Sequence, residues 1–477
     1  FNRDHIVRDH VMNVNTFFAG YTPRFARMGT PRGGGIADGS FVNYAGNVYI
    51  IVGGAPLYVG TWSIYGGVKP STPLTSAQFA ALRPYPADGT LINSQTGSVY
   101  RYAGGAPLYV AGWADIGGPQ PTILVNEDDI VNSGAAAPFD HSRKVPVDGT
   151  FVNTQTGAVY RFAGGAPLYI SSWDDVGGSQ PSTRVSQFAI DQGGNTGSPL
   201  GHVGKYPIDG TFVNTPSGAV YRFAGGAPLY VGSWDDVGGP QPSTRVSQAT
   251  IDQGGNMANP YGHVTKYPLD GTLVNVPSGH VFIFAGGAPL YVSNFAAIGG
   301  SRPTTQISSV TLEQGGAMAL PWGHTLQYPA DGTVLNSPAM TWSFKVAAGV
   351  ATQIPRTAGS TVDAAALDNA GLAFPWNHLK SSVPKASLNV LPTIVTTATV
   401  WLSWSLLVTA SKSTTYDVRW KAGSGVWQNP ASFQGLVKGP LAGATPKRGV
   451  TYCFAIRAHN LAGITGPWSL SRCTKRA

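Results

Sequence analysis

Short runs of alternating hydrophobic and polar residues follow one another along most of the chain. In AVYRFAGGAPLYI, residues 158–170, Val159 and Arg161 alternate with two aromatic residues, which is the period-two pattern of a β-strand. A Gly-Gly pair follows, and a two-residue hairpin turn requires two adjacent residues that can adopt positive φ. We therefore predict a hairpin whose return strand begins at Pro167, one of the few places where a strand accepts proline.

The same hairpin pattern recurs in repeat units that each open on an Asp-Gly pair. Around the hairpin, the pattern predicts an earlier strand, a short helical turn ended by glycine at WDDVGG, a fourth short strand and one further helical turn. The first unit lacks a Gly-His stretch and the sixth has lost the Gly-Gly-Ala-Pro turn, as expected of terminal units where an array ends or closes on itself. The pairs begin at Asp38, Asp88, Asp148, Asp209, Asp270 and Asp331, at intervals of 50, 60, 61, 61 and 61 residues.

Three or four strands in each unit suit the blade of a β-propeller or a unit of an open β-repeat array. A lone hairpin is barely stable in water, so the units must pack on their neighbours. We expect an all-β fold in which six units, residues 38–383, close into a propeller, with an open array as the alternative. Residues 1–37 form an N-terminal segment that could complete the last blade.

The repeat units resemble repeats found in secreted and surface proteins of bacteria, especially actinobacteria. The resemblance rests on Asp-Gly-Thr-Leu/Phe-Val, then Val-Tyr-x-x-x-Gly-Gly, then Pro-Leu-Tyr-Val, and covers roughly residues 38–360. It implies an extracellular β-repeat module that is often linked with surface attachment. It implies no specific ligand.

The repeats stop before the C-terminal segment, residues 384–477. Alternation in ATVWLSWSLL, TTYDVRWKAG and VTYCFAIRAHNLAGITGPWS predicts a β-sandwich there. This segment resembles a fibronectin type III domain, on Trp404, YDVRW at 416–420 and TYCFAIRAHNLAGITGPWS at 451–469. The resemblance places Tyr452 at the position of the family's corner tyrosine.

The chain contains two cysteines, Cys453 and Cys473. The resemblance implies a disulfide that joins the last two strands, as in secreted actinobacterial members of the family; two free buried thiols are the alternative. A disulfide would indicate an oxidising, extracellular location, secreted or at the cell surface. The sequence has no run of 18 apolar residues, so we expect no membrane span. Its start, FNRDHIVRDH, lacks the apolar core of a signal peptide, which is compatible with a processed protein.

Charge is sparse and unevenly distributed. Residues 384–477 hold 11 basic residues and one acid, a net charge of +10, whereas residues 1–383 hold 20 basic and 22 acidic residues, a net charge of −2. The slightly acidic repeat region lacks the basic surface of a nucleic-acid-binding protein, so we expect no nucleic acid partner. The basic segment suits an anionic surface polymer as partner, or simply increases solubility.

Signatures of catalysis are scarce. Gly-x-Ser-x-Gly, His-Glu-x-x-His and P-loop motifs are absent from the sequence. The adjacent carboxylates of Asp174 and Asp175 would point apart on a helical turn and could not flank one glycosidic bond. Each complete unit carries one histidine at the same repeat position, so these recurring histidines are spread over different units. We therefore expect no enzyme activity, no cofactor and no metal site.

Aromatic residues and histidines that recur at fixed repeat positions are the candidates for ligand binding. Aromatic rings stack on sugar rings, but an aromatic residue at a fixed repeat position can equally be core between units. Each histidine, seven residues before the next Asp-Gly pair, could instead hydrogen-bond a loop carbonyl and fix the joint between units. The candidates are Trp62, Trp113, Trp173, Trp234, Tyr109, Tyr169, Tyr230, Tyr291, His202 and His263.

Two classes of function fit these patterns. The first is an extracellular multivalent binding protein with lectin-like recognition of a saccharide or cell-wall polymer, in which several weak sites gain avidity together. The alternative is a structural subunit of an extracellular surface layer or filament, in which the chain assembles with copies of itself.

Overall fold

The computed structural model describes residues 35–477 except 318, 320, 384–385, 397–398, 407–414, 437–440, 445–446 and 460–464. The expectation that residues 1–37 complete the repeat domain therefore falls almost wholly outside the described residues. The chain divides into two compact parts, each considered by itself. The first part runs to Pro107 and includes Gln120–Lys144; the second consists of Leu108–Pro119 and Val145–Ala477.

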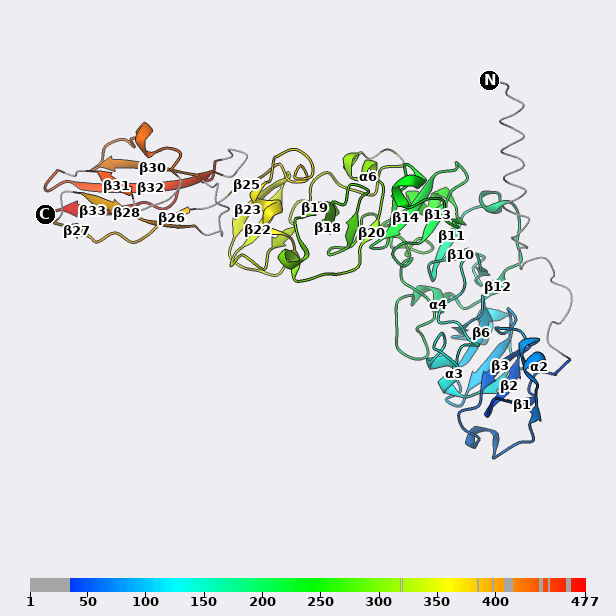
Figure 1. Ribbon diagram of the computed structural model, residues 1–477. Coiled ribbons are helices and arrows are strands. Elements are labelled where there is room, and N and C mark those ends of the chain that lie inside the picture. Colours follow the sequence, from blue (N-terminus) through cyan, green and yellow to red (C-terminus); the bar gives the residue numbers. More distant parts are fainter. Residues whose placement is uncertain are drawn as a thin grey trace, which may run out of the picture. The chain divides into compact units, whose positions relative to one another are not determined.

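The third repeat unit has the elements that its sequence pattern predicts (Figure 1). Its three antiparallel strands are joined by β12, which pairs in parallel with the first of them, and the sheet order is β11-β10-β9-β12. The 3-10 turn η3 ends at Gly177 in the left-handed conformation, as a glycine stop should. The elements are β9 (Phe151–Asn153), β10 (Val159–Ala163), β11 (Ala166–Ile170), η3 (Trp173–Val176), β12 (Thr183–Arg184) and α4 (Gln187–Asp191).

The first two units repeat this order of elements, and each again builds a four-stranded sheet. The first has β1 (Phe41–Tyr44), β2 (Asn47–Val52), β3 (Ala55–Tyr58), η1 (Ser63–Tyr65), β4 (Thr72–Pro73) and α2 (Ser76–Ala80). The second has β5 (Leu91–Ser94), β6 (Val99–Ala103), β7 (Ala106–Tyr109), η2 (Trp113–Ile116), β8 (Ile123–Val125) and α3 (Glu127–Val131).

The last three units follow the same plan, and the sixth gains a fifth strand. The fourth has β13 (Phe212–Asn214), β14 (Val220–Ala224), β15 (Ala227–Tyr230), η4 (Trp234–Val237), β16 (Thr244–Arg245) and α5 (Gln248–Asp252). The fifth has β17 (Leu273–Asn275), β18 (Val281–Ala285), β19 (Ala288–Val292), η5 (Phe295–Ile298), β20 (Thr305–Gln306) and α6 (Ser309–Glu313). The sixth has β21 (Val334–Asn336), β22 (Ser343–Ala347), β23 (Val350–Ile354), β24 (Ser360–Thr361), α7 (Ala364–Asp368) and β25 (Ser381–Val383).

The Gly-Gly pair forms the predicted two-residue hairpin turn. Gly164 and Gly165 have φ values of 55° and 76°, which an L-residue with a side chain rarely adopts. The Gly164 amide donates to the Asp148 carboxylate at 2.7 Å, so the Asp-Gly pair that opens a unit also caps its hairpin. A Cβ on Gly164 would lie 2.2 Å from Thr211 Oγ1 in the next unit. Glycine is therefore required by the close approach of the next unit as well as by the turn.

Neighbouring units share their hydrophobic cores. One cluster combines Ala163 and Leu168 of the third unit with Val213, Phe223 and other residues of the fourth. Corresponding clusters join the fourth unit to the fifth and the fifth to the sixth. The third to sixth units therefore depend on their neighbours for burial, as repeats do in a one-dimensional array.

The sixth unit keeps its hairpin although it has lost the Gly-Gly pair. Ala348 and Gly349 adopt φ values of 49° and 80°, and the Ala348 amide donates to Asp331 as in the other units. Ala348 is exposed, so its methyl group meets no following unit. The outer strand β23 pairs with β25, which occupies the edge of this sheet. The array thus has a distinct C-terminal end.

The first unit also differs at its outward face. Its helix α2 has no buried residue, whereas α4 buries Ala189 and Ile190. Thr75 and Gln78 of the first unit form a capping box with each other. Repeated four-stranded sheets are thus confirmed, but the propeller is not, because the described residues contain no closed ring of sheets.

The C-terminal module is a β-sandwich with a core of its own. Its main sheet has the order β27-β33-β32-β30, and β26-β29 and β28-β31 pair separately. The Tyr452 hydroxyl accepts a hydrogen bond from the Lys447 amide at 3.2 Å, which is the predicted tyrosine corner. The elements are β26 (Ala386–Leu388), β27 (Ile394–Val395), β28 (Val400–Leu402), β29 (Trp404–Leu406), β30 (Thr415–Ala422), η6 (Ala431–Phe433), β31 (Leu441–Ala444), β32 (Thr451–His459) and β33 (Arg472–Arg476).

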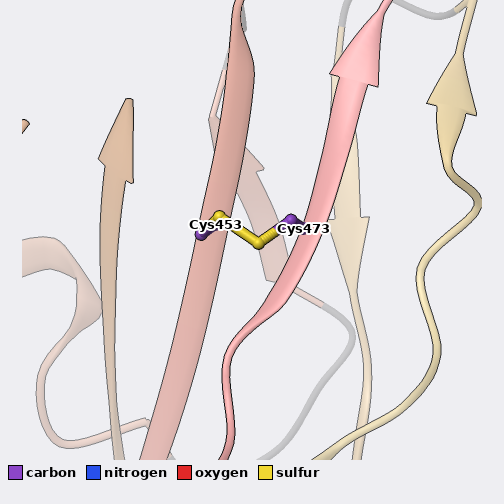
Figure 2. Close-up of a disulfide and its surroundings, with 2 residues drawn as sticks. All are labelled: Cys453 and Cys473. Carbon is purple, nitrogen blue, oxygen red and sulfur yellow. A yellow bond between two sulfur atoms is a disulfide. The ribbon is translucent and has the colours of Figure 1, made fainter. Parts of the chain in front are cut away.

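The two cysteines form the predicted disulfide (Figure 2). Cys453 on β32 lies directly opposite Cys473 on the antiparallel strand β33, so the bond joins the last two strands. Disulfides persist in oxidising compartments, and this one fits an extracellular protein. Among the described residues, no helix is both long and apolar enough to cross a membrane.

Candidate functional site

The candidate tyrosines lie at the joints between repeat units, where each meets a ring from the next unit. Tyr230 on β15 contacts Trp322 edge-to-face, with ring centroids 4.8 Å apart. The two rings of each such contact, called here a joint aromatic pair, are only partly buried. The other pairs are Tyr58 with Phe139 at 5.4 Å, Tyr169 with Tyr261 at 5.2 Å and Tyr291 with Trp376 at 4.6 Å.

The second ring of each joint aromatic pair was missed by the reading of the sequence. It lies two residues before the recurring histidine, and Phe139, Leu200, Tyr261 and Trp322 stand at intervals of 61 residues. This periodicity was available from the sequence, but the position holds four different residue types. The contact itself joins residues about 90 positions apart, so it becomes visible only when the units are stacked.

Polar side chains lie beside two of the joint aromatic pairs. At the joint that contains Tyr169, the Gln187 amide donates to Asp191 at 2.8 Å and to the Tyr160 hydroxyl at 3.3 Å. The ring of Tyr160 in turn lies 6.0 Å from Tyr169. Gln248 and Asp252 repeat this pair one unit later, at 2.8 Å. These joints therefore combine partly exposed rings with an amide and an exposed carboxylate.

The joint between the second and third units lacks the second ring. Leu200 occupies the aromatic position, and Tyr109 contacts Phe188 instead, with centroids 6.4 Å apart. A small, largely apolar pocket of about 10 Å³ remains, and its lining includes Tyr109, Leu200 and His202. That is room for about one water molecule, so this pocket cannot hold a sugar ring.

Three of the recurring histidines, His263, His324 and His378, are buried and hydrogen-bonded to the preceding unit. His263 is 4% exposed, and its Nδ1 donates to the Lys205 carbonyl at 2.9 Å. His324 and His378 make the same contact with the carbonyls of Lys266 and Gln327. Burial lowers the pKa of His263 to about 4, which keeps the imidazole neutral. This geometry favours the role of a joint-fixing residue over ligand contact; His202 is likewise buried.

The candidate tryptophans form a separate set, because the ring contacts they make are with their own unit and not with the joint aromatic pairs. Trp173 and Trp234 each begin a 3-10 turn and pack on a ring of their own unit, Phe151 and Phe212, at 5.4 Å. Trp62 packs in the same way on Phe41, and Trp113, which begins η2, is also partly buried. The candidates from the sequence thus divide into joint tyrosines, buried histidines and these intra-unit tryptophans.

The carboxylates of Asp174 and Asp175 belong to the 3-10 turn η3. Asp175 accepts hydrogen bonds from Ser171 through its carboxylate and from Arg245 through its carbonyl, at 2.9 and 2.6 Å. Within the part of the chain that the structure describes, no three His, Cys, Asp or Glu side chains are grouped to hold a metal ion.

Comparison with known proteins gives only weak similarities. No protein-family model and no curated protein matches the chain. An Fn3-like protein from Clostridium thermocellum is 16% identical over 20% of this chain and 96% of its own, with a TM-score of 0.16. Streptomyces avermitilis α-L-rhamnosidase, solved with L-rhamnose, is 17% identical over 20% and 10%, with a TM-score of 0.15.

A third solved structure, the extracellular domain of a hybrid two-component system from B. thetaiotaomicron, is 6% identical. It covers 92% of this chain and 56% of its own, with a TM-score of 0.16. Scores this low carry no functional argument. The strand order and the tyrosine corner described above support a chain of repeated β-sheet units with an Fn3-like C-terminal module.

Proposed function

We propose that the repeat region is an extracellular multivalent binding protein, and that its sites are the joint aromatic pairs. The ligand is a saccharide or a cell-wall polymer that presents sugar rings. The observation that carries the proposal is the recurrence of partly exposed aromatic pairs at four joints, every joint except that between the second and third units, at 4.6 to 5.4 Å between centroids.

Aromatic rings are large apolar surfaces with low conformational entropy, which suits contact with the apolar faces of sugars. The neighbouring Gln187–Asp191 and Gln248–Asp252 pairs supply acceptors and donors for hydroxyl groups. Each joint is a small site, so affinity would come from several joints that engage one polymer together. The disulfide fits the extracellular location in which such polymers occur.

The chain itself suggests a substitution that removes one ring from a site. Leu200 stands where other units have an aromatic residue, so leucine is compatible with the fold at this position. A glycan array with the full chain identifies a saccharide, and calorimetry with that saccharide then compares the parent with Tyr261→Leu, Trp322→Leu and Trp376→Leu combined. We expect the combined variant to lose binding while its melting temperature stays close to that of the parent.

Two further variants make this test specific. Leu200→Trp completes the missing pair and should increase affinity for a long polymer. Trp234→Leu removes a partly buried ring outside the joints and should leave binding unchanged. Loss of binding in Trp234→Leu alone would move the site to the 3-10 turns. An array without any saccharide signal would refute the proposal in this form.

The alternative, a filament built by end-to-end stacking of repeat arrays, has less support. In a filament, the next array would contact the hairpin turn of the sixth unit. That turn carries Ala348, which is exposed, and the free edge of β23 is already paired with β25. At the other end, Thr75 and Gln78 satisfy each other in a capping box. Sedimentation of the full chain at micromolar concentration distinguishes the two functions, because the binding protein should remain small.

A further inference from the structure

The main sheet of the C-terminal module carries a column of alternating cations and indole rings on its outer face, called here the cation–indole ladder. Arg419 lies between two tryptophans, with its guanidinium carbon 4.3 Å from the ring centroids of both Trp427 and Trp468. Lys421 also packs on Trp427, with its Nζ 5.4 Å from the centroid, and the guanidinium carbon of Arg457 lies 4.5 Å from that of Trp468.

Backbone pairing positions each member of the ladder. Arg419 and Lys421 are two residues apart on β30, so their side chains share one face of the sheet. Gln428 exchanges two backbone hydrogen bonds with Trp420, which holds the adjacent Trp427 beside β30. The Ser469 amide donates to the Ile456 carbonyl at 2.7 Å, which holds the adjacent Trp468 beside β32.

Each indole ring of the ladder has two cations packed on it. Trp427 contacts Arg419 and Lys421, and Trp468 contacts Arg419 and Arg457. Such contacts attract a cation to the ring face and restrict its motion. The ladder therefore restricts the positive groups. Because the Nε of Arg419 is buried, the donors left for another partner are the terminal nitrogens of Arg419 and the ammonium group of Lys421.

The cations of the ladder differ in whether they have an anionic partner. Arg457 donates to the buried carboxylate of Asp417 at 2.9 Å. Within the described part of the chain, the side chains of Arg419 and Lys421 make cation–ring contacts but no hydrogen bond or ion pair. Burial and the charge of Arg457 lower the pKa of Arg419, as expected for a guanidinium without a carboxylate beside it.

The same face has a further positive charge and no exposed acid. Lys475 on β33 is exposed and pairs in register with Thr451, on the side of the sheet that also carries Cys453 and Lys421. The segment 384–477 has a net charge of +10, and its one acid, Asp417, is buried against Arg457 and His459. The face is therefore complementary to a partner with several negative charges.

We propose that the ladder face binds a linear acidic polysaccharide, whose carboxylate or sulfate groups are contacted by Arg419, Lys421 and Lys475. Successive same-face residues of a strand are about 7 Å apart, so Arg419 and Lys421 follow one another along β30. Lys475 adds a third charge on β33, with β32 between the two strands. Both indole rings already have cations packed on them, which leaves less ring surface for stacking nucleic acid bases. This site lies on a different module from the joint aromatic pairs and recognises charge rather than neutral sugar rings.

The experiment uses the full chain and three immobilised polymers: polygalacturonate, dextran sulfate and neutral dextran. Binding is measured by interferometry over a series of NaCl concentrations. The parent should bind an acidic polymer but not neutral dextran, with affinity that falls as salt rises. Arg419→Gln with Lys421→Gln should lower affinity about tenfold and flatten the salt dependence.

A charge-matched control is available in the repeat region. Lys69→Gln with Arg302→Gln removes two exposed positive charges outside the module and should leave affinity unchanged. Arg419→Lys keeps the charge but loses the planar fork of donors, so we expect an intermediate affinity. Near-ultraviolet circular dichroism and free-thiol titration of each variant show whether the module and its disulfide remain intact.

Three outcomes would overturn the proposal. They are equal loss of binding in the control variant, absence of binding to either acidic polymer, and tighter binding to duplex DNA or to phosphatidylglycerol vesicles than to the polysaccharides. The result is independent of the proposed function of the repeats. Trp322→Leu should lower binding of neutral saccharides, whereas Arg419→Gln should lower binding of acidic polymers to the ladder face.

Discussion

The repeat region and the C-terminal module are both built from β-sheets, but they stabilise themselves in different ways. The third, fourth and fifth repeat units each bury residues, such as Ala163 and Leu168, in a cluster completed by the next unit. The module has a core that consists only of its own residues, and a disulfide joins two of its strands. The stability of the repeats therefore depends on the packing between units, whereas the stability of the module depends on its own core and disulfide.

The two regions also use exposed aromatic rings differently. At the joints, Tyr230 and Trp322 meet edge-to-face and stay partly exposed. In the ladder, each indole ring is contacted by two cations. An aromatic residue is thus a candidate platform in one region and a support for cations in the other, and the neighbours of the ring decide which.

The largest expected effect tests the dependence of a repeat on the unit that follows it. In Gly225→Ala, the new Cβ would lie 2.1 Å from Thr272 Oγ1 and 2.8 Å from the Leu269 amide nitrogen, at a φ of +56°. Steric displacement of the next unit and positive φ together should lower the free energy of unfolding by about 4 kcal/mol. Calorimetry of the full chain should show the repeat transition move to lower temperature while the module transition stays in place.

Acid should weaken the repeats before it weakens the module. Burial lowers the pKa of His263 and of His378 to about 4, below the ordinary value of 6.5. Their contribution to stability is therefore present above pH 6.5 and is lost as the pH falls towards 4, by about 3 kcal/mol for each histidine. Urea unfolding between pH 7 and pH 4 measures this loss.

The module should not lose stability in the same pH window. Burial raises the pKa of Asp417, but hydrogen bonds from Gly435, His459 and Arg457 outweigh it and hold the pKa below 3.8. The contribution of Asp417 is therefore lost only below that pH. Burial raises the pKa of Asp368 in the sixth unit to about 6, so protonation of this carboxyl stabilises the repeats as the pH falls. The histidine effect is therefore measured as the difference in unfolding free energy between the parent and His263→Asn. A difference that does not change with pH would contradict the assignment.

Removal of the disulfide should affect the module alone. The bond closes a loop with a sequence separation of 20 residues, so Cys453→Ser with Cys473→Ser should destabilise the module by about 3 kcal/mol. Hydrogen exchange with peptide-level resolution should then show faster exchange in β32 and β33 and unchanged exchange in the repeats. Faster exchange in β14 or β15 would show that the two regions are coupled.

The smallest effect compares a terminal turn with an internal one. Ala348 in the sixth unit has a φ of 49°, which is unfavourable for a residue with a side chain. Its side chain is exposed, so close packing of a following unit does not add to this strain. Ala348→Gly should therefore stabilise the sixth unit by up to about 1 kcal/mol, because relief of strain outweighs the added chain entropy. Thermal unfolding measures the sign, which is opposite to that expected for Gly225→Ala.

Local patterns of sequence predicted the elements of each unit well. The period-two alternation, the Gly-Gly turn and the glycine after WDDV each depend on residues close in the chain, and β10, β11 and η3 follow them. The resemblance of the C-terminal segment likewise led to Tyr452 and the disulfide, which the structure contains. The candidate site was predicted only in part, because the tyrosines were identified but their partner rings were not.

The amino-acid sequence by itself determined the repeat period, the hairpins and the concentration of positive charge in the C-terminal segment. These properties follow from backbone preferences, alternation and composition, which act over a few residues or over whole segments. Tertiary structure decided that Tyr230 meets Trp322, that the histidines hold joints, and that Arg419 lies between two indoles. Each of these contacts joins residues whose proximity depends on how strands and units pack, and packing is a property of the folded chain as a whole.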